Sequence, residues 1–379
     1  MEPNHALTGK TLSELEELCL KFAEPKYRAR QILDWVYRKL ADSFEEMTNL
    51  PLESRRSALG GVKKFIISSS RIKQILTAQD GTRKILIELL DKYCIESVLI
   101  SEPERITLCI STQVGCPIRC NFCASGRKGL IRSLQANEIV EQVLLAQRLL
   151  KPEKHKINNI VIMGMGEPLL NYENLMKALT IITAEWGLGI GTNRITVSTV
   201  GLPDQIDRLA KEKITPNLAI SLHASNDATR RKIIPRAKRQ PPDITSGDKL
   251  RPDQIGTNLI SIKDLMKAAG NYHRSTGKDV TIEYLLIDGL NSEDSSAQEF
   301  ASLLKSYPFG SPKGRDKKSS FKINLILYNQ VPNLSYRSPS METAERFQNI
   351  LRENGLMAFI RKSKGQDIEA ACGQLALKN

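Results

Sequence analysis

Short apolar runs alternate with amphipathic helical patterns from residue 106 to residue 354, and this alternation restricts the fold more than any other feature of the chain. Strands are expected at 106–112, 159–164, 194–199, 218–223, 280–287 and 322–328. Helices are expected at 136–150, 172–185, 202–212, 260–276, 295–307 and 341–354, and a last extended run at 358–363. Repeated strand–helix units favour a parallel sheet with helices outside it. The pattern therefore predicts an α/β fold with a six-stranded partial barrel, whose ligands gather at the carboxyl ends of the strands.

Smaller regions flank this core. Residues 11–60 have a helical pattern, and one buried stripe is expected to hold Leu12, Leu15, Leu18 and Leu20. Strand-like runs follow at 84–89 and 94–101, whereas 236–257 and 309–320 lack periodicity and are expected to be loops. We therefore expect four parts: a helical domain at 1–75, a β extension at 76–105, the barrel at 106–335, and a C-terminal helix, strand and tail at 336–379.

Three cysteines follow the first expected barrel strand. Cys116, Cys120 and Cys123 stand in the run GCPIRCNFCA with the spacing C-x3-C-x2-C. Three thiolates on a short loop can hold three corners of a [4Fe–4S] cluster and leave the fourth iron open. An open iron can bind S-adenosylmethionine (SAM) and pass an electron to its sulfonium. Half of a zinc site is the alternative, but zinc sites usually use C-x2-C pairs with a fourth Cys or His, and no second pair exists here. Inert buried thiols are a further alternative.

Polar residues also end the other expected strands. Gly164-Met-Gly-Glu-Pro168 ends one strand, where the glycines allow close approach of a ligand and Glu167 can accept hydrogen bonds from an ammonium group. Ser198, Ser221, His223 and Asn329 end further strands and fall on the same predicted rim. Each is an ordinary polar group by itself, but together they are expected to form one ligand site.

The charge and the cysteines indicate the environment. A net charge of +13 over 379 residues favours a polyanionic partner, nucleic acid before membrane. Basic residues of the head are candidates for an RNA-facing surface: Lys26, Arg28, Arg30, Arg38, Lys39, Arg55 and Arg56. No apolar run reaches transmembrane length, and no signal-peptide core is seen. The seven cysteines are therefore expected to be thiols of a cytoplasmic protein.

Several segments together resemble the radical-SAM RNA methyltransferases of the RlmN/Cfr family, RlmN most of all. They are the cysteine loop, GMGEP at 164–168, VSTVG at 197–201, SLHAS at 221–225 and DIEAACGQL at 367–375. The head resembles theirs in KYRARQ at 26–31, DWVY at 34–37 and FEEMTNL at 44–50. The resemblance covers nearly the whole chain, and the tail cysteine within it, Cys372, makes it specific.

The resemblance implies a partial (β/α)6 radical SAM barrel with an N-terminal helical accessory domain that binds RNA. It implies that Cys116, Cys120 and Cys123 ligate a [4Fe–4S] cluster. The residues that it places around SAM are Gly166, Glu167, Ser198, Ser221, Leu222, His223 and Asn329. It makes Cys372 the methyl-carrying cysteine, Cys109 the resolving thiol that forms a disulfide with it, and Glu96 the general base.

The chemistry implied by the resemblance is methylation of an adenine ring carbon, carbon 2 in preference to carbon 8. Two SAM molecules are used per cycle: one methylates Cys372, and the second yields a radical that activates this methyl group. The expected substrate is 23S ribosomal RNA, and for some family members also a transfer RNA. A flavodoxin or ferredoxin is the expected electron donor, and a monomer is expected.

Three hypotheses follow. The first is the RNA adenine methyltransferase, of the carbon-2 or the carbon-8 (Cfr) type. The second is a radical SAM enzyme that acts on a non-RNA substrate, in which Cys372 and the positive charge are incidental. The third is a non-catalytic RNA-binding protein with a zinc site, for which metal analysis would show zinc without iron.

Overall fold

The computed structural model describes residues 6–52, 55, 65–235, 260–307 and 321–376. Both predicted loops, at 236–257 and 309–320, and also Arg56 lie outside these residues.

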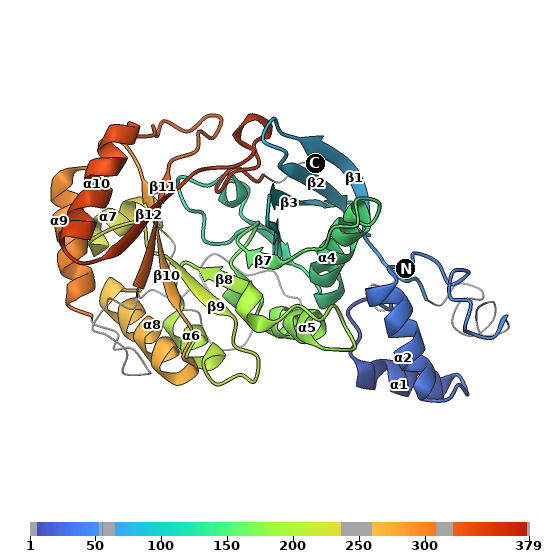
Figure 1. The fold of residues 1–379 in the computed structure, drawn as a ribbon. Coiled ribbons are helices and arrows are strands. Elements are labelled where there is room, and N and C mark those ends of the chain that lie inside the picture. The colour runs from blue at the N-terminus through green and yellow to red at the C-terminus, as the bar shows by residue number, and fades with distance from the viewer. Residues whose placement is uncertain (1–5, 53–54, 56–64, 236–259, 308–320, 377–379) are drawn as a thin grey trace.

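Ten strands of the described residues form one sheet in the order β1-β2-β3-β4-β7-β8-β9-β10-β11-β12 (Figure 1). Their bounds are β1 Arg71–Thr77, β2 Arg83–Glu88, β3 Cys94–Glu102, β4 Arg105–Cys109, β7 Asn159–Ile162, β8 Ile195–Thr199, β9 Asn217–Ser221, β10 Val280–Leu286, β11 Phe321–Leu327 and β12 Met357–Arg361. A separate hairpin pairs β5 (Gln113–Gly115) with β6 (Leu130–Ser133).

The sheet changes character at β4. Strands β1 to β4 pair antiparallel, whereas β4 and β7 to β12 pair parallel throughout. The strand at the centre of the parallel part, β10, is buried at nearly every position, as expected for a sheet covered on both faces. The α/β prediction is therefore confirmed, and the extended run expected near 358–363 is a further parallel strand beside β11.

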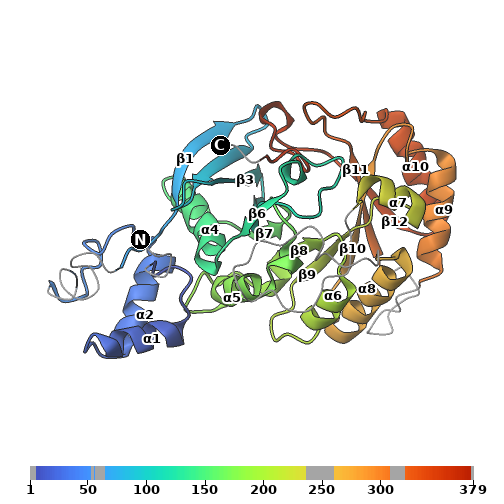
Figure 2. The same ribbon diagram turned by 180° about the vertical axis from the view of Figure 1, so that it is seen from behind.

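Helices lie along the outside of the curved parallel part in both views (Figures 1 and 2). Their bounds are α4 Ala136–Leu150, α5 Tyr172–Thr183, α6 Pro203–Leu209, α8 Ile262–Thr276, α9 Asp294–Lys305 and α10 Met341–Glu353. The short helix α7 (Asp227–Ile233), which the sequence did not predict, follows β9 and lies near the cysteine loop. Short 3₁₀ turns occur at Ala124–Gly126, Pro168–Leu170, Thr192–Arg194 and Gln366–Ile368.

The head comprises α1 (Leu12–Lys21) and α2 (Tyr27–Leu33), which continues into a π-helical turn at Asp34–Arg38. Thr11 and Glu14 form a capping box that starts α1. The stripe predicted for α1 is wrong at Leu20, which is 53% exposed, whereas Cys19 is fully buried. The reason is helical geometry: a residue four positions after Leu15 shares its face, and one five positions after does not.

A buried carboxylate joins the head to the barrel. Glu141 on α4 is fully buried, and its oxygens accept hydrogen bonds from the backbone N–H of Ser69 (2.9 Å) and Ser70 (2.8 Å) and from the hydroxyl of Thr8. Strand β1 begins at Arg71, directly after these contacts, and so crosses the boundary at residue 75 that the sequence suggested. Of the helices described, none is long and apolar enough to cross a membrane.

Candidate active site

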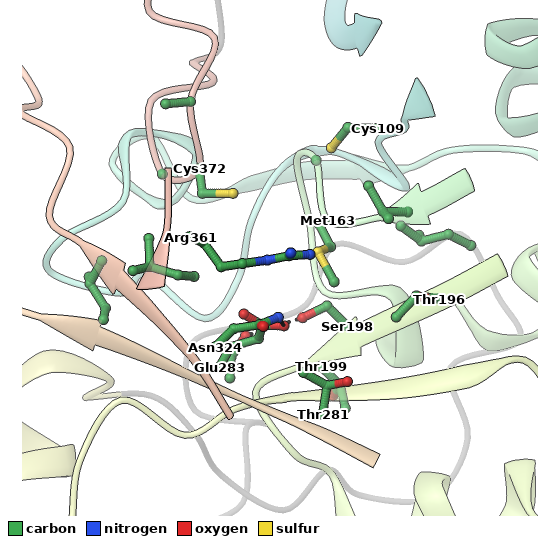
Figure 3. Close-up of a pocket in the computed structure, with 18 of the residues that line it drawn as sticks. Cys109, Met163, Thr196, Ser198, Thr199, Thr281, Glu283, Asn324, Arg361 and Cys372 are labelled. Atoms are coloured by element: carbon green, nitrogen blue, oxygen red, sulfur yellow. Dashed lines mark hydrogen bonds between the residues drawn. The ribbon is translucent and has the colours of Figure 1, made fainter. Parts of the chain in front are cut away.

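A cavity of about 980 Å³ runs along the inside of the barrel, from residues at the amino ends of the strands, such as Arg105 and Asn217, to those at their carboxyl ends. Side chains from β4, β8, β10, β11, β12 and the C-terminal tail point into it (Figure 3). Both the cysteine loop and the segment Gly164–Pro168 contribute to its wall. Of the polar groups that the sequence placed on one rim, Glu167, Ser198, Ser221 and His223 line this one cavity.

The cysteine loop is shaped by two glycines that allow close backbone approach. Gly115 has φ +81°, and a Cβ there would lie 2.0 Å from the carbonyl oxygen of Gly129. The backbone N–H of Cys116 donates to that same oxygen at 3.0 Å. A side chain at Gly115 is therefore excluded, and the loop leaves the β5–β6 hairpin at a fixed position.

Cys116, Cys120 and Cys123 all line the cavity, and their neighbourhood fits a thiolate-bound cluster. Burial raises the pKa of each thiol, and the closeness of the other thiols adds to this for Cys116 and Cys120. Backbone N–H groups oppose the effect by hydrogen bonding to sulfur: those of Ile118 and Arg119 to Cys116, and those of Ser125 and Gly126 to Cys123. Such a site needs bound iron to hold its thiolates.

The arrangement is not that of a single-ion site. Across the described part of the chain, no three His, Cys, Asp or Glu side chains converge closely enough to hold one metal ion. A zinc ion needs four ligands around one point, whereas each cysteine of a [4Fe–4S] cluster binds a different iron.

The segment after β7 positions Glu167. Gly166 has φ +104°, and a Cβ there would lie 2.6 Å from the Cβ of Gln113. The carboxylate of Glu167 accepts hydrogen bonds from the backbone N–H of Leu169 (3.1 Å) and Val200 (2.9 Å). Burial raises its pKa to about 7, and these hydrogen bonds act against the rise. Glu167 is thus a rigid acceptor that faces the cavity.

The other predicted SAM residues differ in how far they reach the cavity. Ser198 and Ser221 line it, and their hydroxyls are 3.2 Å apart. Leu222 is fully buried and is not part of the lining. Asn329 also lies outside the lining, because its side chain is occupied by the C-terminal tail: its amide donates to the carbonyl of Cys372 at 3.1 Å.

His223 is held as a neutral imidazole. It has φ +60°, and its Nδ1 accepts a hydrogen bond from the backbone N–H of Leu285 at 3.1 Å. Burial, together with the positive charge of Arg230, lowers its pKa to about 3. The ring meets Phe122 of the cysteine loop edge-on at 5.1 Å between centroids. Nε2 is therefore the nitrogen that carries the proton.

Cys109, at the end of β4, and Cys372, in the C-terminal tail, both point their sulfur atoms into the cavity (Figure 3). Both are free thiols, as are all seven cysteines, so the structure contains no disulfide. Burial raises the pKa of Cys109 to about 12. Cys372 is exposed to the cavity, and the partial loss of water around its sulfur, followed by the charge of Glu283, raises its pKa to about 11. Each is electrostatically coupled to another cavity cysteine, Cys109 to Cys372 and Cys372 to Cys123.

Glu96 does not line the cavity. It lies on the same face of β3 as Val98, which does, but its carboxylate is paired with Lys84 at 3.3 Å and accepts the backbone N–H of Ala376 at 2.9 Å. The tail therefore covers Glu96 in this conformation.

The tail is attached to the cavity by several further hydrogen bonds. Ala124 of the cysteine loop donates its backbone N–H to the carbonyl oxygen of Gly373 at 2.8 Å. The hydroxyl of Ser125 donates to the carbonyl oxygen of Leu375 at 2.6 Å. Lys84 of β2 donates to the carbonyl of Glu369 at 3.1 Å. These contacts bring the C-terminal end beside β2 (Figure 1).

Sequence reasoning missed several residues that line the cavity. Met163, Glu283, Asn324 and Arg361 are among them. Asn324 lies opposite Glu283 on the neighbouring strand, and its amide donates to that carboxylate at 2.8 Å. A polar residue inside each of two apolar parallel strands was the signal that could have identified this pair.

Comparisons with known proteins agree with this site. Residues 110–301 match the model of the Radical SAM superfamily, and residues 5–58 match that of the Ribosomal RNA large subunit methyltransferase N-terminal domain. A "Probable dual-specificity RNA methyltransferase RlmN" of Thermotoga sp. (strain RQ2) is 44% identical over 353 residues, which are 93% of this chain and 92% of that protein. The "Dual-specificity RNA methyltransferase RlmN" of Syntrophus aciditrophicus (strain SB) is 40% identical over 97% of this chain and 95% of its own length.

A solved structure extends the agreement to three dimensions. The crystal structure of a radical SAM methyltransferase from Sphaerobacter thermophilus superposes with a TM-score of 0.86 at 41% identity and covers 98% of both chains. The fold, the cysteine loop and the relatives lead to one conclusion: the chain belongs to the RlmN family of radical SAM RNA methyltransferases.

Proposed function

We propose that this protein methylates carbon 2 of an adenine in 23S ribosomal RNA, through a methylated Cys372 and a covalent protein–RNA adduct. Transfer RNA is a second substrate to test, since the relatives named above are called dual-specificity enzymes. The observation that carries the proposal is the presence of the Cys109 and Cys372 thiols in the same cavity as the three-cysteine loop. An enzyme that only cleaved SAM would have no use for two further thiols there.

Different residues of the site bind different parts of SAM. Glu167 accepts hydrogen bonds from the amino group, and Ser198 and Ser221 bind the ribose. When bound at the three cysteines, the [4Fe–4S] cluster supplies the electron that cleaves SAM reductively. Asn329 joins the site once it is released from the tail, because its amide is now used by Cys372 and Gln366.

Cys372 receives the methyl group of a first SAM by displacement at carbon, which requires its thiolate. Its raised pKa keeps it protonated until SAM, which is cationic, lies close by. A radical formed from a second SAM would then remove a hydrogen atom from the S-methyl group, and the resulting methylene radical would add to the adenine ring. The adduct radical would give up one electron, which the oxidised cluster would take back. The base is thereby joined to Cys372 through one carbon.

Release of the product needs a base and a second thiol. Glu96 takes the ring proton, after the tail residues that now cover it have moved. Cys109 then attacks the sulfur of Cys372, so that a disulfide forms, the sulfur–carbon bond breaks and the released carbon takes up a proton. The disulfide is a transient stage, consistent with the two free thiols observed.

Mass spectrometry of nucleosides tests the reaction directly. RNA treated with reconstituted enzyme is expected to contain 2-methyladenosine. 8-Methyladenosine would instead assign the Cfr-type reaction. Absence of any methyladenosine, with turnover of a small molecule or a protein, would refute the RNA reaction.

The Cys109→Ala variant tests the resolving role. It is expected to stall after one turnover, with RNA attached to Cys372 and resistant to denaturation on a gel. Cys94→Ala is the matched control, because Cys94 is equally buried on the neighbouring β3 and does not line the cavity. Normal turnover of Cys109→Ala would assign the resolving step to another group.

The surroundings of the reaction complete the proposal. A flavodoxin or ferredoxin donates the electrons, the protein acts as a monomer, and the location is the cytoplasm, where thiols stay reduced. The N-terminal helices bind RNA phosphates, as the match to the ribosomal RNA methyltransferase domain supports.

A further inference from the structure

Arg230, in α7, is a buried cation. Its residue is 3% exposed, and no ion pair to it occurs within the described ranges. One guanidinium nitrogen donates to the carbonyl of Val200, while its Nε is buried and has no hydrogen-bond partner. The nearest acid in the helix, Asp227, uses its carboxylate to accept the backbone N–H of Ile262 at 2.9 Å.

Burying a guanidinium without an ion pair costs free energy. Removing a cation from water carries a penalty of several kcal/mol, unless an opposite charge compensates for it. Burial accordingly lowers the pKa of Arg230, and the groups that oppose this effect are the sulfur of Cys120, when ionised, and then the carboxylate of Asp227. The cysteine loop can therefore supply negative charge to Arg230 in addition to that of Asp227.

Two hydrogen bonds join helix α7 to the cysteine loop. Asn121, which follows Cys120, donates its backbone N–H to the carbonyl of Ile233 at 2.9 Å and its side-chain amide to that of Lys232 at 2.6 Å. Ile118 and Ile233 enclose the contact with apolar surface, against which Cys116 and Cys120 pack. Charges act strongly across such a medium.

Arg230 lies behind the cavity wall. Cys120, Val200 and His223 line the cavity, but Arg230 does not. A second charged group acts on the sulfur of Cys120: the carboxylate of Glu167, whose charge is opposite in sign to that of Arg230.

We propose that Arg230 is a positioning residue that serves as the built-in counter-charge of the cluster and raises its reduction potential. The proposal rests on the assignment of Cys116, Cys120 and Cys123 as cluster ligands. Reduction adds one negative charge to the cluster, and a fixed cation nearby stabilises the reduced form more than the oxidised one. Arg230 thereby makes the electron easier to deliver.

Redox titration of the reconstituted holoenzyme, followed by electron paramagnetic resonance without RNA, tests this. Arg230→Gln is expected to lower the equilibrium constant for reduction at least tenfold, which is about 59 mV for a one-electron couple. Arg230→Lys should retain most of the potential. Arg231→Gln, one residue along and exposed, is the matched control and should leave it unchanged. An unchanged potential in Arg230→Gln with full iron content would overturn the proposal.

Thermal unfolding of the iron-free protein supplies a second readout. Without iron the buried cation is uncompensated, so Arg230→Met is expected to unfold at the same or a higher temperature than the parent. If the iron-free variant instead unfolds at a clearly lower temperature, Arg230 has a merely structural role and the proposal fails. Failure to load iron in a variant that folds normally supports it. Neither readout depends on RNA, so a failure of the proposed methylation would be seen separately.

Discussion

Individual polar residues inside the barrel occupy one level of neighbouring strands. Glu283 of β10 pairs in register with Ser221 on one side and with Asn324 on the other. Ser221 in turn meets the hydroxyl of Ser198 on β8. Four strands thus contribute a continuous polar row to the cavity floor, in which Glu283 is the one ionisable member.

Glu283→Gln is expected to make stability less dependent on pH. Burial raises the folded pKa of this carboxyl from 4.5 to about 7, against the effects of Asn324, Arg361 and Lys322. The folded state therefore binds more protons than the unfolded state between these values, and the parent loses stability as pH rises from 4.5 to 7. The variant should be more stable at pH 8 by up to about 3 kcal/mol and unchanged at pH 4.

Urea unfolding at both pH values measures this effect. Glu104→Gln is the control, because Glu104 is exposed and should show no such gain. A gain for Glu283→Gln that is equal at pH 4 and pH 8 would mean that ionisation is not its cause.

Gly166→Ala is expected to destabilise the protein by about 3 kcal/mol. The φ of +104° strains any L side chain, and the new Cβ would also lie 2.9 Å from the backbone nitrogen of Gln113. Gly189→Ala isolates the strain from the clash: its φ is +67°, and no atom lies within 4 Å of the added Cβ. Equal losses in the two variants, measured by urea unfolding, would show that the clash is relieved by movement of Gln113.

Among the elements, β10, α9 and α10 are joined by an aromatic cluster. The ring centroids of Tyr284 and Phe300 are 4.5 Å apart, and those of Tyr284 and Phe347 are 5.2 Å apart. All three side chains are fully buried. The cluster fixes two helices against the strand that carries Glu283.

Phe300→Ala is therefore expected to cost about 3–5 kcal/mol, through lost burial and the cavity that remains. Gln298→Ala, at an exposed site of the same helix, is the control for helix propensity and should change stability by less than about 0.5 kcal/mol. The midpoint of urea unfolding measures both. A cost near 1 kcal/mol for Phe300→Ala would mean that α9 and α10 move together to fill the space.

At the scale of the whole molecule, the head presents fewer free cations than its composition suggests. The Nε of Arg28 lies 3.6 Å from a carboxylate oxygen of Glu24. The guanidinium of Arg38 donates to the carbonyl oxygen of Glu185 at 2.7 Å. The guanidinium of Arg55 donates to the carbonyl oxygen of Leu50 at 3.1 Å. Lys26 and Arg30 are exposed, and the described residues give their side chains no partner. These two are the best candidates for contacts to RNA phosphates.

The double variant Lys26→Glu and Arg30→Glu is expected to weaken RNA binding severalfold. The slope of log binding constant against log salt concentration should also become less steep by roughly 1 to 2, because each phosphate contact contributes about 0.7 to 0.9 to that slope. The RNA-free cleavage of SAM should be unaffected. Lys211→Glu with Lys213→Glu makes the same change of charge at exposed positions after α6. An equal loss in both double variants would indicate a general effect of net charge.

Local patterns in the sequence determined the course of the barrel and the place of the cysteine loop. Strand and helix periodicities are properties of short windows, and Cys116, Cys120 and Cys123 are neighbours along the chain, so neither depends on distant contacts. The same reasoning failed at Leu20 and did not find α7, because burial there depends on what packs against each short helix.

Only the tertiary structure decided which distant groups share the cavity. Cys109 and Cys372 both line the cavity because the tail folds back over β2 and the cysteine loop. The tail also covers Glu96 and accepts a hydrogen bond from the side-chain amide of Asn329. Arg230 likewise gained its place from the docking of α7 on Asn121. Strand register and the return of the tail are set by contacts between residues far apart in the chain, about which the periodicity of any one segment carries no information.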